Sequence, residues 1–261
     1  MSAPVELRAV GVVKEYGPRS RRHRALDDVS VSVTEGQRLG IVGESGSGKS
    51  TLSRILVGLE RPTSGAMDYA GRSVRDALGN NTDRLRFRRD VQFVGQDTTS
   101  SFDPRRTLLE AVTAPLRRLR EMSETEAVAA ALEMVARLEL DPSLAYRYPL
   151  QVSGGQRQRF ALARGLVVRP RVLICDEVVS ALDVSVQGAI LNLIKTYCAD
   201  SGAALVFVSH GLPATAFVTE ELIVMNRGRI VETGKSRDVL TAPKDEYTET
   251  LVRAYRGSAA A

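Results

Sequence analysis

The sequence predicts an α/β fold built around a mainly parallel sheet, and three observations indicate it. Downstream of residue 155, apolar runs of strand length alternate with segments of helical period, as crossover connections require. Near the N-terminus, a glycine-rich stretch separates an apolar run from a helical pattern. Residues 97–160 are mostly of helical period, which predicts a helical insert within the α/β core.

The N-terminal part of the chain is expected to contain short strands and one helix. Val-rich runs that alternate or remain apolar predict strands at residues 5–13, 29–33, 37–42 and 91–94. Apolar side chains at helical spacing predict a helix at residues 50–59, and a turn follows at residues 62–65. Residues 70–86 are polar and irregular, so no element is predicted there.

The rest of the chain alternates helices and strands. Residues 107–140 carry a helical period, in which Ser123 and Glu126 have the spacing of a capping box. Further helices are expected at residues 162–168 and 186–197. Further strands are expected at residues 172–175, 204–208 and 222–225.

Composition limits the class of protein. The length of 261 residues fits one large α/β domain or a core with an inserted subdomain. A hydrophobic fraction of 43% and a charged fraction of 26% are typical of a soluble protein. No apolar stretch reaches the ~18–20 residues of a membrane helix and no signal peptide is visible, so we expect a cytosolic protein. Cys175 and Cys198 lack paired spacing, so neither a disulfide framework nor a zinc site is expected.

The net charge of +5 comes partly from two groups of arginines. We favour solvated loops as their setting. A nucleic-acid patch is disfavoured because aromatic residues are only 5% of the chain and do not interleave with the arginines. Attraction to an anionic membrane surface is an intermediate possibility. The two groups are Arg19, Arg21, Arg22 and Arg24, and then Arg84, Arg86, Arg88 and Arg89.

A glycine-rich loop with the pattern GxxxxGK[ST] follows the apolar run at residues 39–42. In such a loop, backbone N–H groups converge on phosphate oxygens and the next helix adds partial positive charge. We expect Lys49 to hold the β- and γ-phosphates, Ser50 to ligate Mg²⁺ and Thr51 to reach the α-phosphate. The alternative is a turn that binds nothing, and the loop alone does not separate kinases, GTPases and motor ATPases. Its residues are Gly43, Glu44, Ser45, Gly46, Ser47, Gly48, Lys49 and Ser50.

Two carboxylates follow the apolar strand at residues 172–175. Strand ends in a parallel sheet open toward the ligand crevice. Asp176 is therefore expected to hold Mg²⁺ directly or through a water, and Glu177 to polarise the attacking water as a general base. The alternative is a pair of ordinary surface acids, which a phosphate loop upstream disfavours.

A serine–glycine–glycine stretch precedes this acidic strand. Alone, it would be a helix cap with flexible glycines. At this spacing the sequence strongly resembles the ABC ATPase family, which carries such a signature shortly before its acidic strand. Ser153 opens a helix N-terminus, a natural anion site, and the resemblance implies contact with the γ-phosphate bound to a second, facing subunit. The stretch is Val152, Ser153, Gly154, Gly155 and Gln156.

Four further motifs match the family in order. Tyr16 resembles the aromatic residue that stacks on adenine, with a core or turn tyrosine as the alternative. Gln96, after the strand at residues 91–94, resembles the glutamine that senses Mg²⁺ and the attacking water. The stretch Ser180–Asp183 resembles the loop that spans the two subunits, and Asp183 also fits a helix cap. His210, at a strand end, resembles the histidine that contacts the γ-phosphate.

The resemblance extends from about residue 5 to residue 252 and implies one nucleotide-binding domain over residues 1–261. A RecA-like P-loop core with an N-terminal antiparallel β subdomain would occupy residues 1–96 and 161–261. An α-helical signature subdomain would occupy residues 97–160. Two such cassettes would close face to face around two ATP molecules with Mg²⁺, and closure would be the step that produces work.

Several stretches are similar to one branch of the family, the oligopeptide, dipeptide and nickel importers. The resemblance implies import of peptides or related small solutes, with the segment after Gln96 receiving a cytoplasmic helix of a membrane permease. The implied partners are permease subunits, a second identical or different cassette and, indirectly, an extracytoplasmic solute-binding protein. The protein would then be peripheral, on the cytoplasmic side of the cell membrane, and nucleic acid is not expected as a partner. The stretches are Val91–Asp97, Ser101–Thr107, Tyr148–Pro149, Ala181–Gln187 and Asp245–Thr248.

The chain also departs from the branch pattern, at Gly95, Val152, Val178, Val179 and Gly211. None of these departures removes a catalytic group, although they bear on turnover and coupling. An extended tail with a cysteine cluster is missing, so no iron–sulfur site is expected. Two other functions stay open: a cassette in a soluble enzyme complex, such as the phosphonate-cleaving assembly, and a non-transport cassette in translation or DNA repair. A P-loop kinase would explain neither the signature nor His210.

Overall fold

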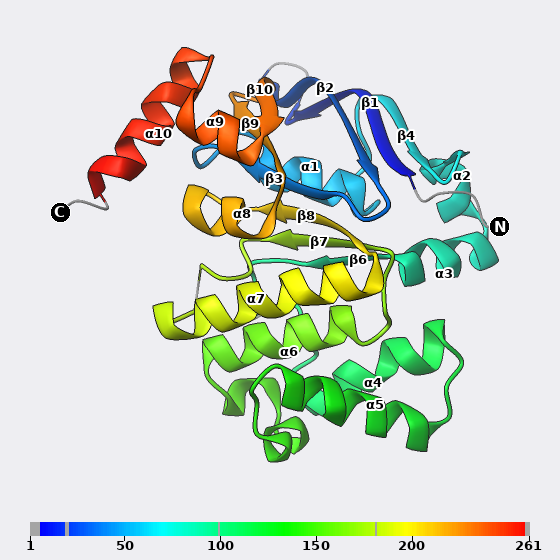
Figure 1. Ribbon diagram of the computed structural model, residues 1–261. Coiled ribbons are helices and arrows are strands. Elements are labelled where there is room, and N and C mark those ends of the chain that lie inside the picture. The colour runs from blue at the N-terminus through cyan, green and yellow to red at the C-terminus, as the bar shows by residue number, and fades with distance from the viewer. Residues whose placement is uncertain (1–5, 19–20, 99, 181, 259–261) are drawn as a thin grey trace.

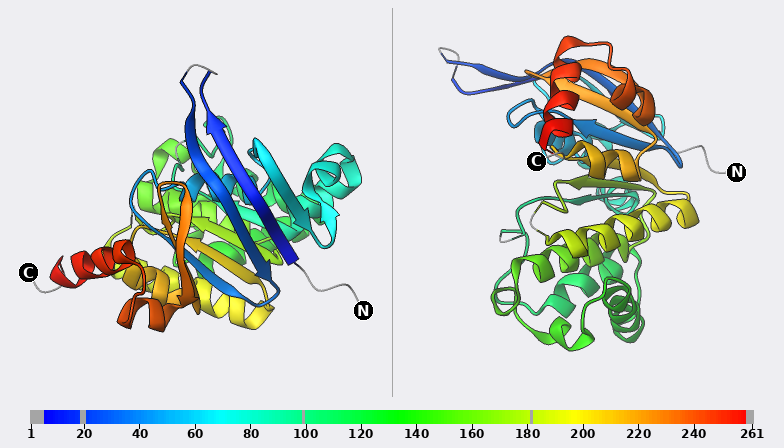
Figure 2. Two further views of the ribbon diagram at one scale, coloured as in Figure 1. Left: turned by 90° about the horizontal axis from the view of Figure 1, so that it is seen from above. Right: turned by 60° about the vertical axis from the view of Figure 1, so that its left-hand side comes forward.

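The computed structural model describes residues 6–18, 21–98, 100–180 and 182–258, and these form two sheets (Figure 1). The first sheet is antiparallel, in the order β2-β1-β4-β5. Burial alternates along β2, because one face of the sheet packs on the core. Figure 2 shows the β1–β2 pair projecting beyond the body. The predicted N-terminal antiparallel β subdomain is thus confirmed, with strands β1 (Glu6–Tyr16), β2 (His23–Thr34), β4 (Ser64–Tyr69) and β5 (Arg72–Ser73).

The second sheet has six strands in the order β10-β9-β3-β8-β7-β6. Only the β9–β10 pair is antiparallel, so the predicted mainly parallel sheet is confirmed. The strands β7 and β8 are buried throughout, because both faces of the sheet are covered. The strands are β3 (Arg38–Val42), β6 (Val91–Val94), β7 (Val172–Asp176), β8 (Ala204–Val208), β9 (Glu221–Asn226) and β10 (Arg229–Lys235).

Helices cover this sheet and continue away from it. Figure 1 shows α7 and α6 below the sheet and α4 and α5 farther down, on the side opposite the antiparallel sheet. Two short 3-10 turns, η1 (Pro142–Tyr146) and η2 (Pro149–Gln151), precede α6. The helices are α1 (Lys49–Leu56), α2 (Val74–Gly79), α3 (Asn81–Asp90), α4 (Leu108–Leu119), α5 (Glu124–Arg137), α6 (Gly154–Leu166), α7 (Val184–Ser201), α8 (Leu212–Val218), α9 (Ser236–Thr241) and α10 (Glu246–Ser258).

Reciprocal capping boxes open three of the four helices below the sheet, namely α4, α5 and α6 but not α7. The predicted box of Ser123 and Glu126 is present at the start of α5. Thr107 and Glu110 form the same arrangement at α4, and Ser153 and Gln156 form it at α6. Each box pairs two backbone N–H groups that would otherwise lack partners at a helix start.

The segment at residues 70–86 is more regular than its sequence indicates. It contains β5, α2 and the first part of α3, where the Asn80 side chain caps α3 by accepting from the Thr82 N–H at 2.8 Å. The second arginine group therefore lies on a helix, and the prediction of a loop for it was wrong. In the first group, Arg22 and Arg24 both pair with Glu15. Arg19 lies outside the described residues.

The large hydrophobic clusters lie on the two faces of the parallel sheet. One joins the sheet to α1 and the antiparallel sheet, and the other joins it to the helices below. Cys175 and Cys198 are buried and unpaired in the second of these. The helix α6 continues past residue 160, so the predicted boundaries of the helical subdomain cut through one helix. In the described ranges, no helix combines the length and apolar character needed to span a bilayer.

Candidate active site

Four loops meet at one edge of the parallel sheet. The strand register places Val208 of β8 beside both Ile41 of β3 and Asp176 of β7. Because the carboxyl ends of parallel strands share one edge, the loops that follow β3, β6, β7 and β8 lie together. These loops carry residues 43–50, which are predicted to bind phosphate, and the candidates Gln96, Glu177 and His210.

The phosphate loop has a backbone that only its glycines allow. Gly43 and Gly48 have φ angles of 150° and 102°. A Cβ at Gly48 would lie 2.5 Å from the carbonyl oxygen of Ala25, and one at Gly43 would lie 2.2 Å from that of Met225. The loop therefore packs directly against neighbouring backbone. The helix α1 begins immediately afterwards at Lys49, so the unpaired N–H groups of its first turn adjoin the loop.

Lys49 lies within the curve of this loop. Its Nζ donates to the carbonyl oxygens of Gly43 and Glu44, each at 2.8 Å. Burial lowers the pKa of the Lys49 amine, while the carboxylates of Glu177, Asp176 and Glu44 oppose that shift. The loop carbonyls thus hold a cationic group inside the curve of the loop, and a cation there is suited to an anionic phosphate.

Ser50 and Asp176 form the oxygen-rich part of the site. Ser50 Oγ donates to Asp176 Oδ1 at 3.2 Å, which joins the start of α1 to the end of β7. Burial raises the pKa of Asp176, and the nearby Glu177 raises it further, against the opposing effects of the Ser50 hydrogen bond and Lys49. Mg²⁺ prefers one or two protein oxygen ligands beside phosphate oxygens and waters. These two side chains fit that requirement.

Asp176→Asn is expected to raise the stability of the protein without nucleotide. The folded-state pKa of Asp176 lies above the ordinary 3.8, so ionisation costs folding free energy as the pH rises through the folded pKa. The amide removes this cost and still offers Ser50 an acceptor. Thermal unfolding should show a higher melting temperature for the variant than for the wild type at neutral pH. This difference in melting temperature should shrink as the pH is lowered toward the ordinary pKa of an aspartate. A lower melting temperature at neutral pH would contradict the stated cost.

Glu177 and His210 face each other beside this pair. His210 Nδ1 lies 3.2 Å from Glu177 Oε2. Glu177 has a φ angle of 53°, in the left-handed region that residues other than glycine rarely adopt. Two hydrogen bonds of 2.8 Å hold this backbone: the Glu177 N–H donates to the Val208 carbonyl, and Ser180 Oγ donates to the Glu177 carbonyl. Such strain persists only where the surroundings enforce it, and it is common at functional sites.

Gln96 and Tyr16 lie at the margins of the site. Gln96 is exposed, two residues beyond the end of β6. Tyr16 ends β1 and is 37% exposed, with the Lys14 ammonium 4.9 Å from its ring centroid. Its hydroxyl donates to Glu60. Adenine stacking by Tyr16 stays a prediction.

The signature lies on a different part of the molecule. Ser153 is the exposed N-cap of α6, where its hydroxyl accepts from the Gln156 N–H at 3.2 Å. Within the described ranges, the hydrogen bonds of the Ser153 hydroxyl and N–H join it to Gln156 and not to the phosphate loop. A Cβ on Gly155 would lie 3.3 Å from Leu182, so the loop that includes Asp183 packs beside the signature.

For Asp183, the predicted position at a helix start is confirmed, but the predicted side-chain cap is not present. Asp183 occupies the N-cap position of α7, but its side chain makes no capping hydrogen bond. Ala181, which belongs to the predicted subunit-spanning loop, lies outside the described residues.

Sequence reasoning missed two tyrosines of α10 that contact the active-site loops. Tyr247 Oη accepts from the Glu44 N–H at 2.9 Å, and Tyr255 Oη donates to the carbonyl oxygen of His210. Tyr247 lies in one of the stretches that resemble the importer branch, but nothing in that resemblance indicated a contact with the phosphate loop. No sequence signal marked Tyr255.

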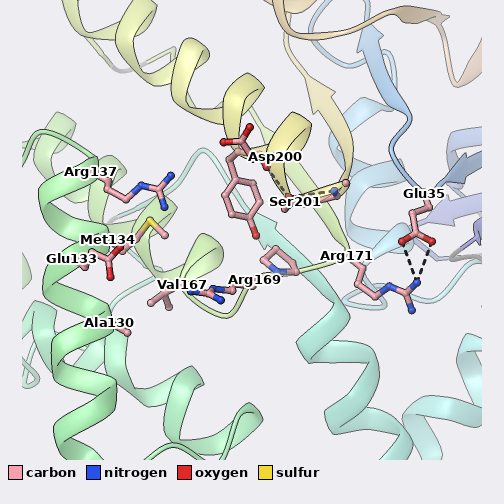
Figure 3. Close-up of a pocket in the computed structure, with 14 residues that line it drawn as sticks. Glu35, Ala130, Glu133, Met134, Arg137, Val167, Arg169, Arg171, Asp200 and Ser201 are labelled. Carbon is pink, nitrogen blue, oxygen red and sulfur yellow. Dashed lines mark hydrogen bonds and ion pairs between the residues drawn. The ribbon is translucent and has the colours of Figure 1, made fainter. Parts of the chain in front are cut away.

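Two cavities lie away from these catalytic candidates. One of about 530 Å³, shown in Figure 3, lies where α5, the end of α7 and the loop before β7 meet, and it includes Arg137, Arg169 and Asp200. Another, of about 540 Å³, is a groove between the end of α1, β6 and α4, which we call the α1–α4 groove. The groove is defined by Leu59, Arg88, Phe93, Ala111, Pro115 and Leu119.

Comparison with known proteins identifies the family to which the chain belongs. The family model described as "ABC transporter" matches residues 26–180. The oligopeptide transport ATP-binding protein OppF of Lactococcus lactis subsp. lactis is 39% identical over 230 residues, which is 88% of this chain and 72% of OppF. The nickel import ATP-binding protein NikE of Escherichia coli O157:H7 is 41% identical over 233 residues, which is 88% of this chain and 86% of NikE.

Solved structures show the same fold. A dimeric structure of MJ0796, described as a bacterial ABC transporter cassette, aligns with a TM-score of 0.82 at 32% identity and covers 88% of this chain and 99% of that one. A post-hydrolysis state of MJ0796 bound to ADP and Pi aligns with a TM-score of 0.80, at the same identity and coverage. Together with the phosphate loop and the acidic strand end, these matches show that the chain belongs to the ABC transporter family, as an ATP-binding and ATP-hydrolysing subunit.

Proposed function

We propose that this subunit drives the import of peptides or related small solutes through a membrane permease. The observation that carries the proposal is the 39% identity with OppF over 88% of the chain. Nickel is the second candidate solute, because NikE is similarly related at 41% identity. The transported solute would not touch this chain, since the residues of the site are suited to nucleotide phosphates.

The proposed roles of the site residues follow from their positions. Lys49 binds the β- and γ-phosphates, and Glu177 accepts a proton from the attacking water, oriented by its contact with His210 at 3.2 Å. Gln96 approaches the same site from the end of β6. Ser50 and Asp176 would hold Mg²⁺, which when bound neutralises charge on the phosphates.

The site is completed by a second cassette in this proposal. Ser153 and Gly154 lie exposed at the start of α6, and an exposed helix N-terminus is suited to a γ-phosphate presented from outside. The dimeric state of MJ0796 supports this pairing. Asp183, on the loop packed beside the signature, would lie at the interface between the cassettes.

The α1–α4 groove supports a peripheral location on the cytoplasmic side of the membrane. Its Leu59 is 63% exposed, a large apolar side chain at a concave site. Phe93 lies three residues before Gln96, so the groove adjoins the loop that enters the active site. An amphipathic helix of the permease would bury Leu59 there, and its movement would be coupled to the loop that carries Gln96.

Solute uptake by cells tests the proposed function. Cells in which Glu177→Gln replaces the natural subunit should take up labelled oligopeptides at background rate, because hydrolysis no longer resets the transporter. Uptake of Ni²⁺ in the same cells should be unchanged. Loss of nickel uptake alone would favour the second candidate, and normal uptake of both solutes would contradict the import function.

A further inference from the structure

The C-terminal helix α10 touches the active site at two separate loops. It projects beside α9 on the left of Figure 1, outside the six-stranded sheet. Tyr247, at its start, accepts a hydrogen bond of 2.9 Å from the backbone N–H of Glu44 in the phosphate loop. Tyr255, two turns later, donates to the backbone carbonyl of His210. One helix therefore links the loops that carry Lys49 and His210.

The two tyrosines share a stripe of the helix with a buried leucine. Tyr247, Leu251 and Tyr255 are spaced at i, i+4 and i+8, so they lie along one side over about 12 Å of helix axis. Leu251 is 8% exposed and belongs to a hydrophobic cluster that includes Val42 of β3. This cluster fixes the distance between α10 and the strand that leads into the phosphate loop.

The start of α10 is anchored to β10 by carboxylates. The Asp245 side chain caps the helix by accepting from the Tyr247 N–H at 2.9 Å and the Thr248 N–H at 3.4 Å. Glu232 of β10 accepts from the N–H groups of Lys244 and Asp245 at 3.0 and 3.1 Å. The position of Tyr247 is therefore set by strand β10 and not by the phosphate loop it contacts.

Both hydroxyl groups are kept neutral where they act. Burial raises the pKa of Tyr247 and of Tyr255, and for Tyr255 the nearby Glu177 carboxylate raises it further. The Tyr255 hydroxyl thus remains a donor to His210 at neutral pH, close to the carboxylate that pairs with the His210 ring. The His210 side chain is exposed, and Tyr255 contacts this residue through its backbone carbonyl.

We propose that α10 is a positioning element of the hydrolytic site, in which Tyr255 places His210 against Glu177 and Tyr247 holds the shape of the phosphate loop. This inference rests on the proposed roles of His210 and the loop. Each tyrosine contacts a backbone atom and acts through another residue. Loss of the Tyr255 contact should therefore lower turnover, and loss of the Tyr247 contact should weaken nucleotide binding.

Hydroxyl deletions in the full-length protein separate these effects. Tyr255→Phe should lower kcat about threefold to tenfold with nucleotide affinity unchanged, the range expected for loss of one hydrogen bond. Tyr247→Phe should weaken binding of a fluorescent ATP analogue by a similar factor with kcat largely kept. Tyr146→Phe is the matched control, since Tyr146 is 59% exposed on η1 and should behave as wild type.

The histidine ring provides a readout that a merely structural role would not move. The sequence has only two histidines, so Cε1–H resonances of His210 and His23 are assigned with a His23→Gln variant. Tyr255→Phe should shift the His210 resonance and leave that of His23 in place. A wild-type kcat together with an unshifted His210 resonance would overturn the proposal. Failure of the proposed import function is distinguishable, because it would appear as normal solute uptake by Glu177→Gln cells, whereas the His210 resonance reports positioning in the isolated protein.

Discussion

Glu177→Gln should abolish steady-state ATP hydrolysis while leaving ATP binding intact. Glutamine keeps the size and one acceptor oxygen of Glu177 but does not take a proton, so the general-base contribution of about 10²- to 10⁴-fold is lost. The phosphate ligands Lys49 and Ser50 are untouched, since Lys49 Nζ is held by loop carbonyls. Phosphate release and binding of a fluorescent ATP analogue check the two halves of this expectation.

The same variant should accumulate as an ATP-bound dimer, seen by light scattering after size exclusion. Adding Ser153→Ala to it should weaken that dimer by about ten- to a hundredfold, the value of a hydrogen bond to a charged group. Ser123→Ala is the matched control, because Ser123 caps α5 with the same box and its loss costs comparable helix stability. The face-to-face site would be contradicted if Ser153→Ala and Ser123→Ala, each added to Glu177→Gln, left the same amount of ATP-bound dimer. Wild-type turnover by Glu177→Gln would also contradict it.

Leu59→Glu should uncouple hydrolysis from transport. Leu59 is 63% exposed, so the substitution should leave folding and the ATPase rate of the isolated subunit near wild type. In the complex, the carboxylate would replace an apolar contact with the permease helix, and removing this charge from water costs several kcal/mol. Solute uptake should therefore fall to background although the protein still hydrolyses ATP. Wild-type uptake by this variant would exclude the α1–α4 groove as the permease site.

The positions of the main catalytic candidates were predictable because they depend on local pattern. The phosphate loop, the acidic end of β7 and His210 each follow an apolar run that forms a buried strand of the parallel sheet. Parallel strands bring their following loops to one edge, so the strand pattern together with the family resemblance predicted that these groups lie together. The capping box of Ser123 was equally local, since it needs only two residues three positions apart.

Short polar elements were not predictable. The helices α2 and α3 lie in a stretch whose apolar side chains are too few to give a period, and more than half of α3 is arginine and aspartate. It forms because Asn80 caps it and Phe87 is buried against the core, with Tyr69 packed edge-on at 5.3 Å. These are tertiary contacts, which override the weak local preference of such a segment.

The contacts of α10 were beyond sequence reasoning for a different reason. Glu44 and Tyr247 are 203 residues apart, and their pairing depends on where β10 delivers the helix. The left-handed backbone of Glu177 is likewise imposed by β8, through the carbonyl of Val208. Neither feature has a residue pattern of its own, because the partner atoms belong to the backbone.

Capture of the tagged protein from its own cells in mild detergent tests the central claim most directly. The first sample is the Glu177→Gln protein with ATP. The second is the same protein carrying Leu59→Glu as well. The third is a control that carries Tyr146→Glu in place of Leu59→Glu and so alters another exposed apolar side chain. Mass spectrometry should identify multi-span membrane permeases, with or without a second cassette, in the first and third samples but not in the second. Recovery of only soluble enzymes or ribosomal components in all three samples would contradict the import function, while the ATPase assignment would stand.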